Sequence, residues 1–402
     1  WTWNANTIYI YSSTNPNTEY SSVEIPQLGN VIYIGSYDYL AIDNLDINFA
    51  SVGIDSYEQR DGQNRIGFTL SNSKISWIGS KWHRSAGDAA PGNGYGTAVM
   101  RSNLLFTNNE ISECGRRLIS SHLYSASNIV LTNMVYENNY FHDGYHGTGV
   151  SPRFTWGNNK INGLIIRNNT FYEPPDKVPG VYTANFVSAE ASGSGTTGIT
   201  NVQIYNNIFM HGTKWDIHII ANVSNVSIYN NVFYEKNRHT YSSSNMDFIV
   251  LEAMNLIYPT NVRIKNNIFY NTGSRTTNAA QYALAFNPGT PSTAISEMDY
   301  NLIYYTDTYL GVIRFETGSL TYRTAGGTKN LIPDLSTDLG WQQNSPTNYL
   351  ISPGFVSTGT NPNLHLSSGS PAIGTGINVG LTTDHAGTNW NNPPSIGAYE
   401  YS

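Results

Sequence analysis

The stretches VQIYNNIF at 202–209 and VSIYNNVF at 226–233 share one pattern, V-x-I-x-N-N-x-F. Apolar residues alternate with other residues before the asparagine pair, which is typical of a strand with one buried face. Asn tolerates the left-handed backbone region and bonds to neighbouring backbone groups, so the pair predicts a turn. The final x-F predicts a second, short strand. The sequence therefore predicts a strand–turn–strand unit.

The same unit recurs along most of the chain. Clear copies are LLFTNNEI (104–111), MVYENNYF (134–141), LIIRNNTF (164–171) and VRIKNNIF (262–269), and weaker ones are LAIDNLDI (40–47), FTLSNSKI (68–75) and EMDYNLIY (297–304). The first Asn of the clear copies stands at 108, 138, 168, 206, 230 and 266, giving steps of 30, 30, 38, 24 and 36 residues. One such coil cannot bury its own apolar side, whereas stacked coils build a continuous core. Stacking at about 4.8 Å also places the second Asn of each pair over the next, so that their amides form a ladder.

This repeat resembles the single-stranded right-handed parallel β-helix, the pectate-lyase-like fold, with about nine or more coils. The missing L-x-x-L-x-L frame excludes leucine-rich repeats, and the variable spacing excludes a propeller. The opening TWNANTIYIYSSTNPNTEYSSVEIPQ resembles the lead-in segment of β-helix carbohydrate-active enzymes, and the ending PPSIGAYEYS resembles the closing coil of many secreted bacterial β-helix proteins. The expected organisation is a lead-in and cap at 1–30, the β-helix at 31–325, and C-terminal coils with a closing segment at 326–402, all in one domain.

Composition narrows the class of protein further. Of 402 residues, 39% are hydrophobic, enough for a long core, and only 12% are charged, about half the usual share in soluble proteins. The net charge of −7 and the lack of a basic stripe argue against nucleic acid as a partner, and no run of about eighteen apolar residues predicts a membrane span. Cys114 is the only cysteine, so we expect a small buried residue and no disulfide framework. We expect a secreted, extracellular monomer whose signal peptide has been removed.

A further strand in each coil is expected to form one exposed parallel sheet, where proteins of the resembled fold bind their ligands. Its copies are TAVMRSN (97–103), LISSHLY (118–124), GVSPRFT (149–155), FVSAEAS (186–192), DIHIIAN (216–222), FIVLEAM (248–254), ALAFNPG (283–289) and VIRFETG (312–318). Because alternate strand residues point in and out, one outward column can be extracted from these copies. It reads Arg101, His122, Arg153, Glu190, His218, Glu252, Asn287 and Glu316. The place of His218 requires its strand to be shifted by one residue.

The competing interpretation is that the row is polar for structural reasons alone, since opposite charges one rung apart stabilise a sheet. However, at least six ionisable groups in eight coils is an enriched row when only 12% of residues are charged. The flanking loops at 172–184 and 234–247 are long, aromatic and polar, as cleft walls that bind sugars are. The predicted substrate-binding residues are Arg101, His122, Tyr145, His146, Lys177 and Tyr182.

A polysaccharide-degrading glycoside hydrolase is the slightly favoured function. Hydrolysis of a glycosidic bond uses two carboxyl groups, and an inverting enzyme separates them more widely than a retaining one. Glu190 and Glu252 would lie two rungs apart, roughly 9.6 Å between backbones. His218 would tune the pKa of one carboxyl group or bind a hydroxyl, and Arg153 would hold an acidic or hydroxylated substituent. These four are the predicted catalytic residues, and the expected partner is a polysaccharide or oligosaccharide.

The main alternative is a polysaccharide lyase that cleaves a uronate-containing polymer by β-elimination. Such a reaction needs a cation to neutralise the uronate and a base to take the C5 proton. Arg153 or Arg101 would neutralise, and His122, His146, Lys177 or Tyr145 would act as base or acid. No cofactor is expected to be required. Ca²⁺ stays an option, although no D-x-D or E-x-E cluster supports it.

Two other functions compete with enzymatic cleavage of a polysaccharide. One is a non-catalytic glycan-binding β-helix, which would show long polar or apolar rows without paired carboxylates. The other is a metal site built from His142, Asp143 and His146. Their H-D-x-x-H spacing follows a strand and a turn, so it lacks the one-face geometry that a helix gives to zinc ligands. We therefore predict no metal site.

Overall fold

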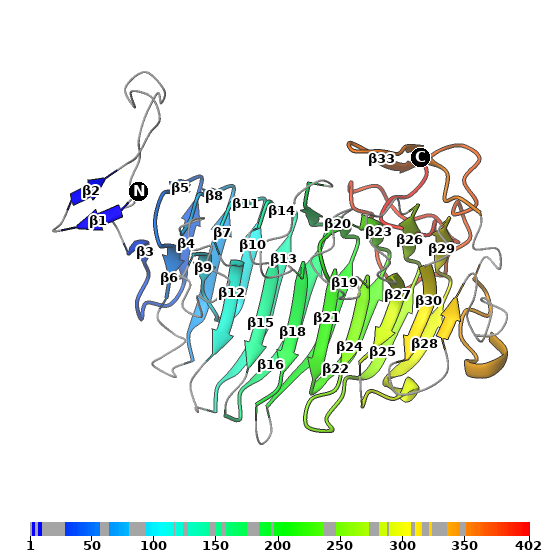
Figure 1. Ribbon diagram of the computed structural model, residues 1–402, viewed down its shortest axis with the longest axis horizontal. Coiled ribbons are helices and arrows are strands. Elements are labelled where there is room, and N and C mark those ends of the chain that lie inside the picture. Colours follow the sequence, from blue (N-terminus) through cyan, green and yellow to red (C-terminus); the bar gives the residue numbers. More distant parts are fainter. Residues whose placement is uncertain are drawn as a thin grey trace.

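A computed structural model of the protein describes residues 2–4, 7–9, 29–56, 64–79, 94–115, 117–123, 128–144, 149–154, 157–174, 185–193, 197–236, 247–272, 281–287, 289–306, 310–315, 321–323, 336–345 and 351–402. Three long sheets run side by side along an elongated solenoid, which is a single-stranded right-handed parallel β-helix (Figure 1). The predicted fold is therefore confirmed. No helix among the residues listed in these ranges has the length and apolar character that crossing a membrane requires.

Each coil contributes one strand to each sheet in turn. Sheet 1 consists of β3 (Asn30–Tyr33), β6 (Val52–Asp55), β9 (Tyr95–Ala98), β12 (Arg117–Leu123), β15 (Val150–Phe154), β18 (Val187–Ala191), β21 (Ile217–Ala221), β24 (Ile249–Glu252), β27 (Gln281–Phe286), β30 (Leu310–Phe315) and β31 (Thr321–Arg323). Sheet 2 consists of β4 (Leu40–Asp43), β7 (Ile66–Ser71), β10 (Ser102–Thr107), β13 (Val130–Glu137), β16 (Lys160–Arg167), β19 (Gly198–Tyr205), β22 (Val223–Tyr229), β25 (Thr260–Lys265) and β28 (Ile295–Asp299). Sheet 3 consists of β5 (Asp46–Asn48), β8 (Lys74–Ser76), β11 (Glu110–Ser112), β14 (Tyr140–His142), β17 (Thr170–Tyr172), β20 (Ile208–Gly212), β23 (Val232–Lys236), β26 (Ile268–Asn271) and β29 (Leu302–Tyr305).

Four short strands lie outside these sheets, and one strand closes sheet 1 differently. β1 (Thr2–Asn4) pairs antiparallel with β2 (Thr7–Tyr9), and β32 (Phe355–Ser357) pairs antiparallel with β33 (Asn363–Leu366). β31 also joins β30 in the antiparallel sense. A single turn of 3₁₀ helix, η1 (Ser292–Ala294), precedes β28.

The core consists of columns of identical residue types. In five consecutive coils the phenylalanine that ends the repeat points inward, and its ring stacks on that of the next coil. Centroid separations are 5.1, 4.9, 4.9 and 4.7 Å along the column Phe141, Phe171, Phe209, Phe233 and Phe269. The parallel register pairs these residues directly with one another. Cys114, expected as a small core residue, is fully buried.

The asparagine pairs make the corner between sheets 2 and 3. The first Asn of each pair has a left-handed backbone, for example φ of 55° at Asn138 and 54° at Asn168. The second Asn is buried, and the Nδ2 of Asn139 donates to Oδ1 of Asn169 at 3.0 Å. Asn169 in turn donates to Asn207 at 3.1 Å, so the predicted amide ladder is confirmed.

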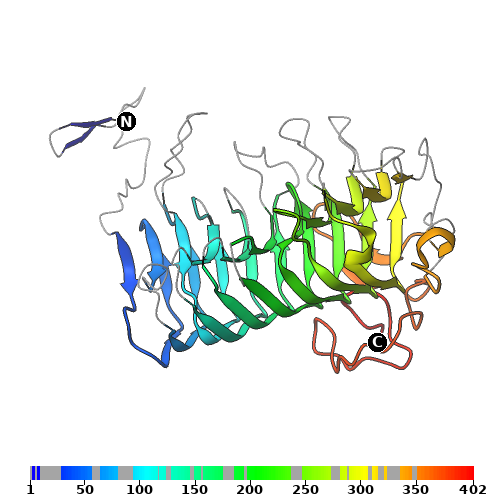
Figure 2. The ribbon, with the colours of Figure 1, turned by 90° about the horizontal axis from the view of Figure 1, so that it is seen from below.

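The C-terminal residues 351–402 contribute to none of the three sheets, contrary to the expectation of further coils there. They pack against the outer face of sheet 3 in the second half of the solenoid, as Figures 1 and 2 show in orange and red. Phe355, Leu364 and Ile396 meet Tyr234 and Ile268 in one apolar cluster. This half of sheet 3 is therefore apolar on both faces, and residues 351–402 cover the outer one.

Substitution of a ladder asparagine should destabilise the fold strongly. In Asn169→Ala, the backbone N–H of Asn139 loses its acceptor at 2.9 Å and the carbonyl of Tyr136 loses a donor at 2.9 Å. Each buried group left without a partner costs about 1–3 kcal/mol, so the free energy of unfolding should fall by at least about 2 kcal/mol in urea titrations. Asn162→Ala removes an exposed amide and serves as the control, with an expected change within about 0.5 kcal/mol. Equal losses in the two variants would contradict a structural role for the ladder.

Candidate functional site

The outer face of sheet 1 carries the predicted row of polar residues. Along the column, the backbone of His122 pairs with Arg153, and Arg153 pairs with Glu190. Ile220 follows and separates Glu190 from Glu252. Neighbouring strands lie about 4.8 Å apart, so the two glutamates are two rungs apart, as predicted.

His218 does not lie in this column, so the expected shift of its strand was wrong. β21 keeps the register of its neighbours, which fills the column with Ile220 and pairs His218 with Ser188 and Val250. The imidazole still faces the same surface and reaches Glu252 diagonally, with 2.7 Å between Nε2 and Oε2. The structure thus brings His218 and Glu252 together by a different geometry.

Arg153 and Glu190 form a tightly bonded ion pair. Nε of Arg153 lies 2.6 Å from Oε2 of Glu190, and Nη2 donates to Oε1 at 3.1 Å. The hydroxyl of Ser192 donates to the same Oε1. The exposed fraction of the side chain is 5% for Glu190 and 31% for Arg153. The carboxylate is therefore enclosed, and the guanidinium is the part of the pair that a ligand can reach.

Burial and hydrogen bonds together shift the pKa values of His218 and Glu252. Burial lowers the pKa of His218, although the bond to Glu252 acts in the opposite direction. The hydrogen bond from His218 lowers the pKa of Glu252 and outweighs burial, and Asn287 donates a further bond at 3.0 Å. Asn185 places its Nδ2 3.4 Å from Nδ1 of the imidazole. These contacts assign a neutral imidazole with the proton on Nε2, beside an ionised carboxylate.

Lys214 and Trp215, in the turn before β21, complete the site and were not among the predicted residues. Nζ of Lys214 lies 3.8 Å from the centroid of the Trp215 ring, which packs edge-on against His218 at 4.2 Å. Burial lowers the pKa of Lys214, while the charge of Glu252 raises it. Nε1 of Trp215 and Oδ1 of Asn185 are buried without a hydrogen-bond partner among the residues that the structure describes.

Arg101 does not belong to the row, so its predicted place on sheet 1 was wrong. β9 ends at Ala98, and Arg101 lies in the connection that leads into β10. Its side chain is fully buried, and its guanidinium donates to the carbonyl oxygens of Tyr37 and, at 3.1 Å, Gly35. Five donors on one guanidinium suit it to gather backbone carbonyls, and here they tie the first coils together.

The other predicted substrate-binding residues stay predictions. Outside the described residues lie Tyr145, His146, Lys177 and Tyr182, together with the last member of the row, Glu316. The backbone of His122 is placed beside Arg153.

No group of three or more His, Cys, Asp or Glu side chains within the described ranges is arranged to hold a metal ion. The nearest approach to one is on the outer face of sheet 3. There His142 bonds to Asp143 at 2.8 Å and lies 3.3 Å from Glu110, which pairs with Lys74 at 2.8 Å. These side chains form an ion-pair network on a different sheet from the row. Among the described residues, no cluster of carboxylates is therefore arranged to hold Ca²⁺.

Comparison with known proteins gives a likeness in structure. No protein-family model matches the chain, and no curated protein matches it in sequence. Among solved structures, the crystal structure of pectate lyase Pel9A is similar with a TM-score of 0.41 and 14% sequence identity, over 94% of this chain and 87% of that chain. A likeness of this strength assigns neither a substrate nor a catalytic residue to this chain.

The burial of His218 predicts a loss of stability on acidification. The folded pKa lies below the unfolded value of about 6.5, so below that pH the unfolded chain binds a proton that the folded chain does not. Stability is then present above about pH 6.5 and falls below it, by up to about 1.4 kcal/mol per pH unit. His218→Gln should flatten the dependence of the free energy of unfolding on pH between 7 and about 5.5. An unchanged slope in urea titrations of the variant would refute this assignment.

Proposed function

We propose that the protein is a polysaccharide lyase that cleaves a uronate-containing polymer on the outer face of sheet 1. Lys214 acts as the base, and Arg153 neutralises the uronate carboxylate. The observation that carries the proposal is the enclosure of Glu190 behind Arg153, with side-chain exposures of 5% and 31%. It leaves Arg153 and Lys214 as partly accessible cations on this surface.

The reaction requires one proton transfer to a protein group and one elimination. A uronate carboxylate beside the guanidinium of Arg153 has its negative charge balanced, which stabilises the additional charge that develops when the C5 proton leaves. The amine of Lys214 takes that proton. The electron pair forms the C4–C5 double bond, the C4–O glycosidic bond breaks, and the departing oxygen takes a proton from water.

The pKa of Lys214 supports its role as the base. A lysine in water is almost fully protonated at neutral pH, whereas burial here lowers the pKa and increases the neutral fraction. The Trp215 ring fixes the amine at 3.8 Å from its centroid. Both ring nitrogens of His218 are engaged, Nε2 with Glu252 and Nδ1 with Nδ2 of Asn185, so His218 positions the site and leaves Lys214 as the group that can accept a proton.

Hydrolysis by the glutamate pair receives less support. An inverting hydrolase needs both carboxyl groups at the scissile bond, one of them protonated. Glu190 is enclosed by Arg153 and Ser192. The bond from His218 lowers the pKa of Glu252, which keeps that group ionised. Neither glutamate thus offers an accessible proton.

Lys214→Ala should abolish cleavage without preventing folding. Loss of a general base lowers the rate about 10²- to 10⁴-fold. The assay is the ultraviolet absorbance of the unsaturated product, followed with polygalacturonate, alginate and glycosaminoglycans, with and without Ca²⁺. Lys160→Ala, which removes an exposed lysine on sheet 2, is the matched control and should retain full activity.

The same assay separates the competing functions. New reducing ends without the ultraviolet absorbance would mean hydrolysis and would overturn the lyase proposal. Retained binding of a polymer with no cleavage would indicate a glycan-binding protein. Full activity of Lys214→Ala would refute the assignment of the base.

Glu252→Gln should shift the pH profile of the elimination to lower pH. The charge of Glu252 raises the pKa of Lys214, so its removal lowers that pKa. The rising limb of kcat/KM against pH reports the base of the free enzyme and should move in the acidic direction, while the limiting rate at high pH changes little. A limb that stays in place would show that another group is the base.

A further inference from the structure

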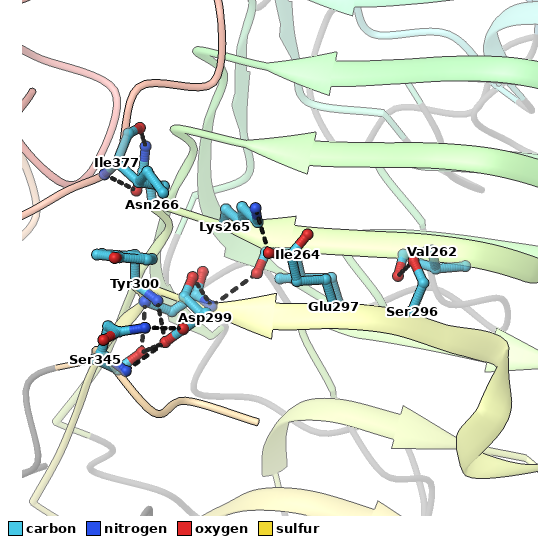
Figure 3. A network of polar contacts seen from close by, with 12 residues as sticks. Val262, Ile264, Lys265, Asn266, Ser296, Glu297, Asp299, Tyr300, Ser345 and Ile377 are labelled. Carbon is cyan, nitrogen blue, oxygen red and sulfur yellow. Dashed lines mark hydrogen bonds and ion pairs between the residues drawn. The ribbon is translucent and has the colours of Figure 1, made fainter. Parts of the chain in front are cut away.

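The corner between sheets 2 and 3 lies on the opposite side of each coil from sheet 1, and the C-terminal segment runs along it. The first Asn of successive pairs holds the segment through side-chain amides. Asn206 donates to the carbonyl of Thr383 at 2.7 Å, and Asn266 donates to that of Ile377 at 2.7 Å (Figure 3). These contacts hold the segment alongside the corner, where it forms one wall of a groove.

Two adjoining hollows lie between this wall and the asparagine corner. The first measures about 240 Å³ and is lined by Arg167, Asn168, Tyr205, Asn206 and residues 380–383. The second measures about 110 Å³ and is lined by Asn230, Trp390, Pro394 and residues 377–379, 381 and 391–392. Leu381 lines both. The hollows therefore form one groove along the column of first asparagines, each large enough for more than one water molecule.

Polar atoms in the walls of this groove lack protein partners. Oδ1 of Asn168, Oδ1 of Asn206 and Nε1 of Trp390 are buried, and the described part of the chain offers none of them a hydrogen bond. Asn206 is only 1% exposed as a residue, so its amide oxygen is withdrawn from bulk water. Buried polar groups are nearly always hydrogen-bonded in native proteins. Two acceptors and one donor, all on residues that line the two hollows, thus point to a ligand that both donates and accepts.

The charge in the groove is balanced. Arg167 is its only lining cation or anion among the described residues, and its Nε donates to Glu137 at 2.7 Å. Its Nη1 donates to the Tyr205 hydroxyl at 2.9 Å. Glu137 thus balances the charge of this guanidinium. The rings of Tyr205 and Trp390 add flat apolar surfaces.

We propose that this groove is a second, non-catalytic carbohydrate site that binds a neutral oligosaccharide. Sugar hydroxyls both donate and accept hydrogen bonds, which matches the unpartnered amide oxygens and indole N–H, and the apolar face of a pyranose packs on an aromatic ring. The site lies away from sheet 1 and does not depend on the proposed cleavage there. It would attach the protein to a neutral glycan while sheet 1 acts on a different polymer.

The test is isothermal titration of the full chain with four soluble β-linked tetrasaccharides, of glucose, xylose, mannose and galactose. Thr382→Trp places an indole in the first hollow from an exposed position. The backbone carbonyl of residue 382 still accepts the backbone N–H of Trp390 at 3.2 Å. Trp390→Phe keeps an aromatic ring and removes the N–H. Val356→Trp, at an exposed position of the same segment that lines neither hollow, is the bulk-matched control.

We expect at least one tetrasaccharide to bind the unmodified chain. Each groove variant should weaken that binding about tenfold, and the control should leave it unchanged. Melting temperatures and the activity measured on sheet 1 should match those of the unmodified chain, which separates this site from the proposed lyase. The proposal is overturned if none of the four sugars binds, or if both groove variants bind as the unmodified chain does.

Discussion

In the buried asparagine column, the side-chain amide of each asparagine donates to the amide oxygen of the asparagine in the next coil. The same oxygen also accepts the backbone N–H of the donating asparagine. At Asn139 both bonds go to Oδ1 of Asn169, at 3.0 and 2.9 Å. The corner that brings the chain from sheet 2 to sheet 3 is polar backbone that water does not reach, so without this column its donors would be unpaired. Each coil thus supplies what the next corner lacks. The constraint holds the coils in one register along the whole solenoid.

That register decides the geometry of the candidate site on sheet 1. Because the asparagine corner has the same length in every coil, variation in coil length falls at the other two corners. Lys214 and Trp215 stand in a short connection at 213–216, between strands whose register the ladder already holds. A short connection between fixed strands leaves little freedom to the backbone. The backbone of Lys214 therefore has a fixed position along the solenoid axis relative to the column of Arg153, Glu190 and Glu252.

The repeat made the fold and half of the site predictable from sequence, for a physical reason. A period-2 pattern anchored on an asparagine pair sets both the strand faces and the stacking, so the Arg153–Glu190 pair followed from alignment alone. The alignment failed at His218 because it chose a polar residue for the outward column and shifted the strand to do so. The strand keeps its register, and Ile220 lies between Glu190 and Glu252 in the column. It failed at Arg101 because the sequence alone does not show that β9 ends at Ala98. Lys214 lies between repeats, where no periodicity exists, and only burial beside Glu252 marks it out.

The packing of residues 351–402 on sheet 3 has a consequence for how long the apolar outer face of that sheet stays exposed during synthesis. Tyr234, Tyr270 and Ile268 point outward from strands made long before the segment that covers them. During synthesis, a ribosome-bound chain would therefore display a stacked aromatic strip along half of one sheet, and exposed strips of this kind invite association. The strip stays uncovered until residues 351–402 have been made, because they follow in the sequence the strands that they cover. Residues 351–402 therefore shield apolar surface that the solenoid alone would expose to water.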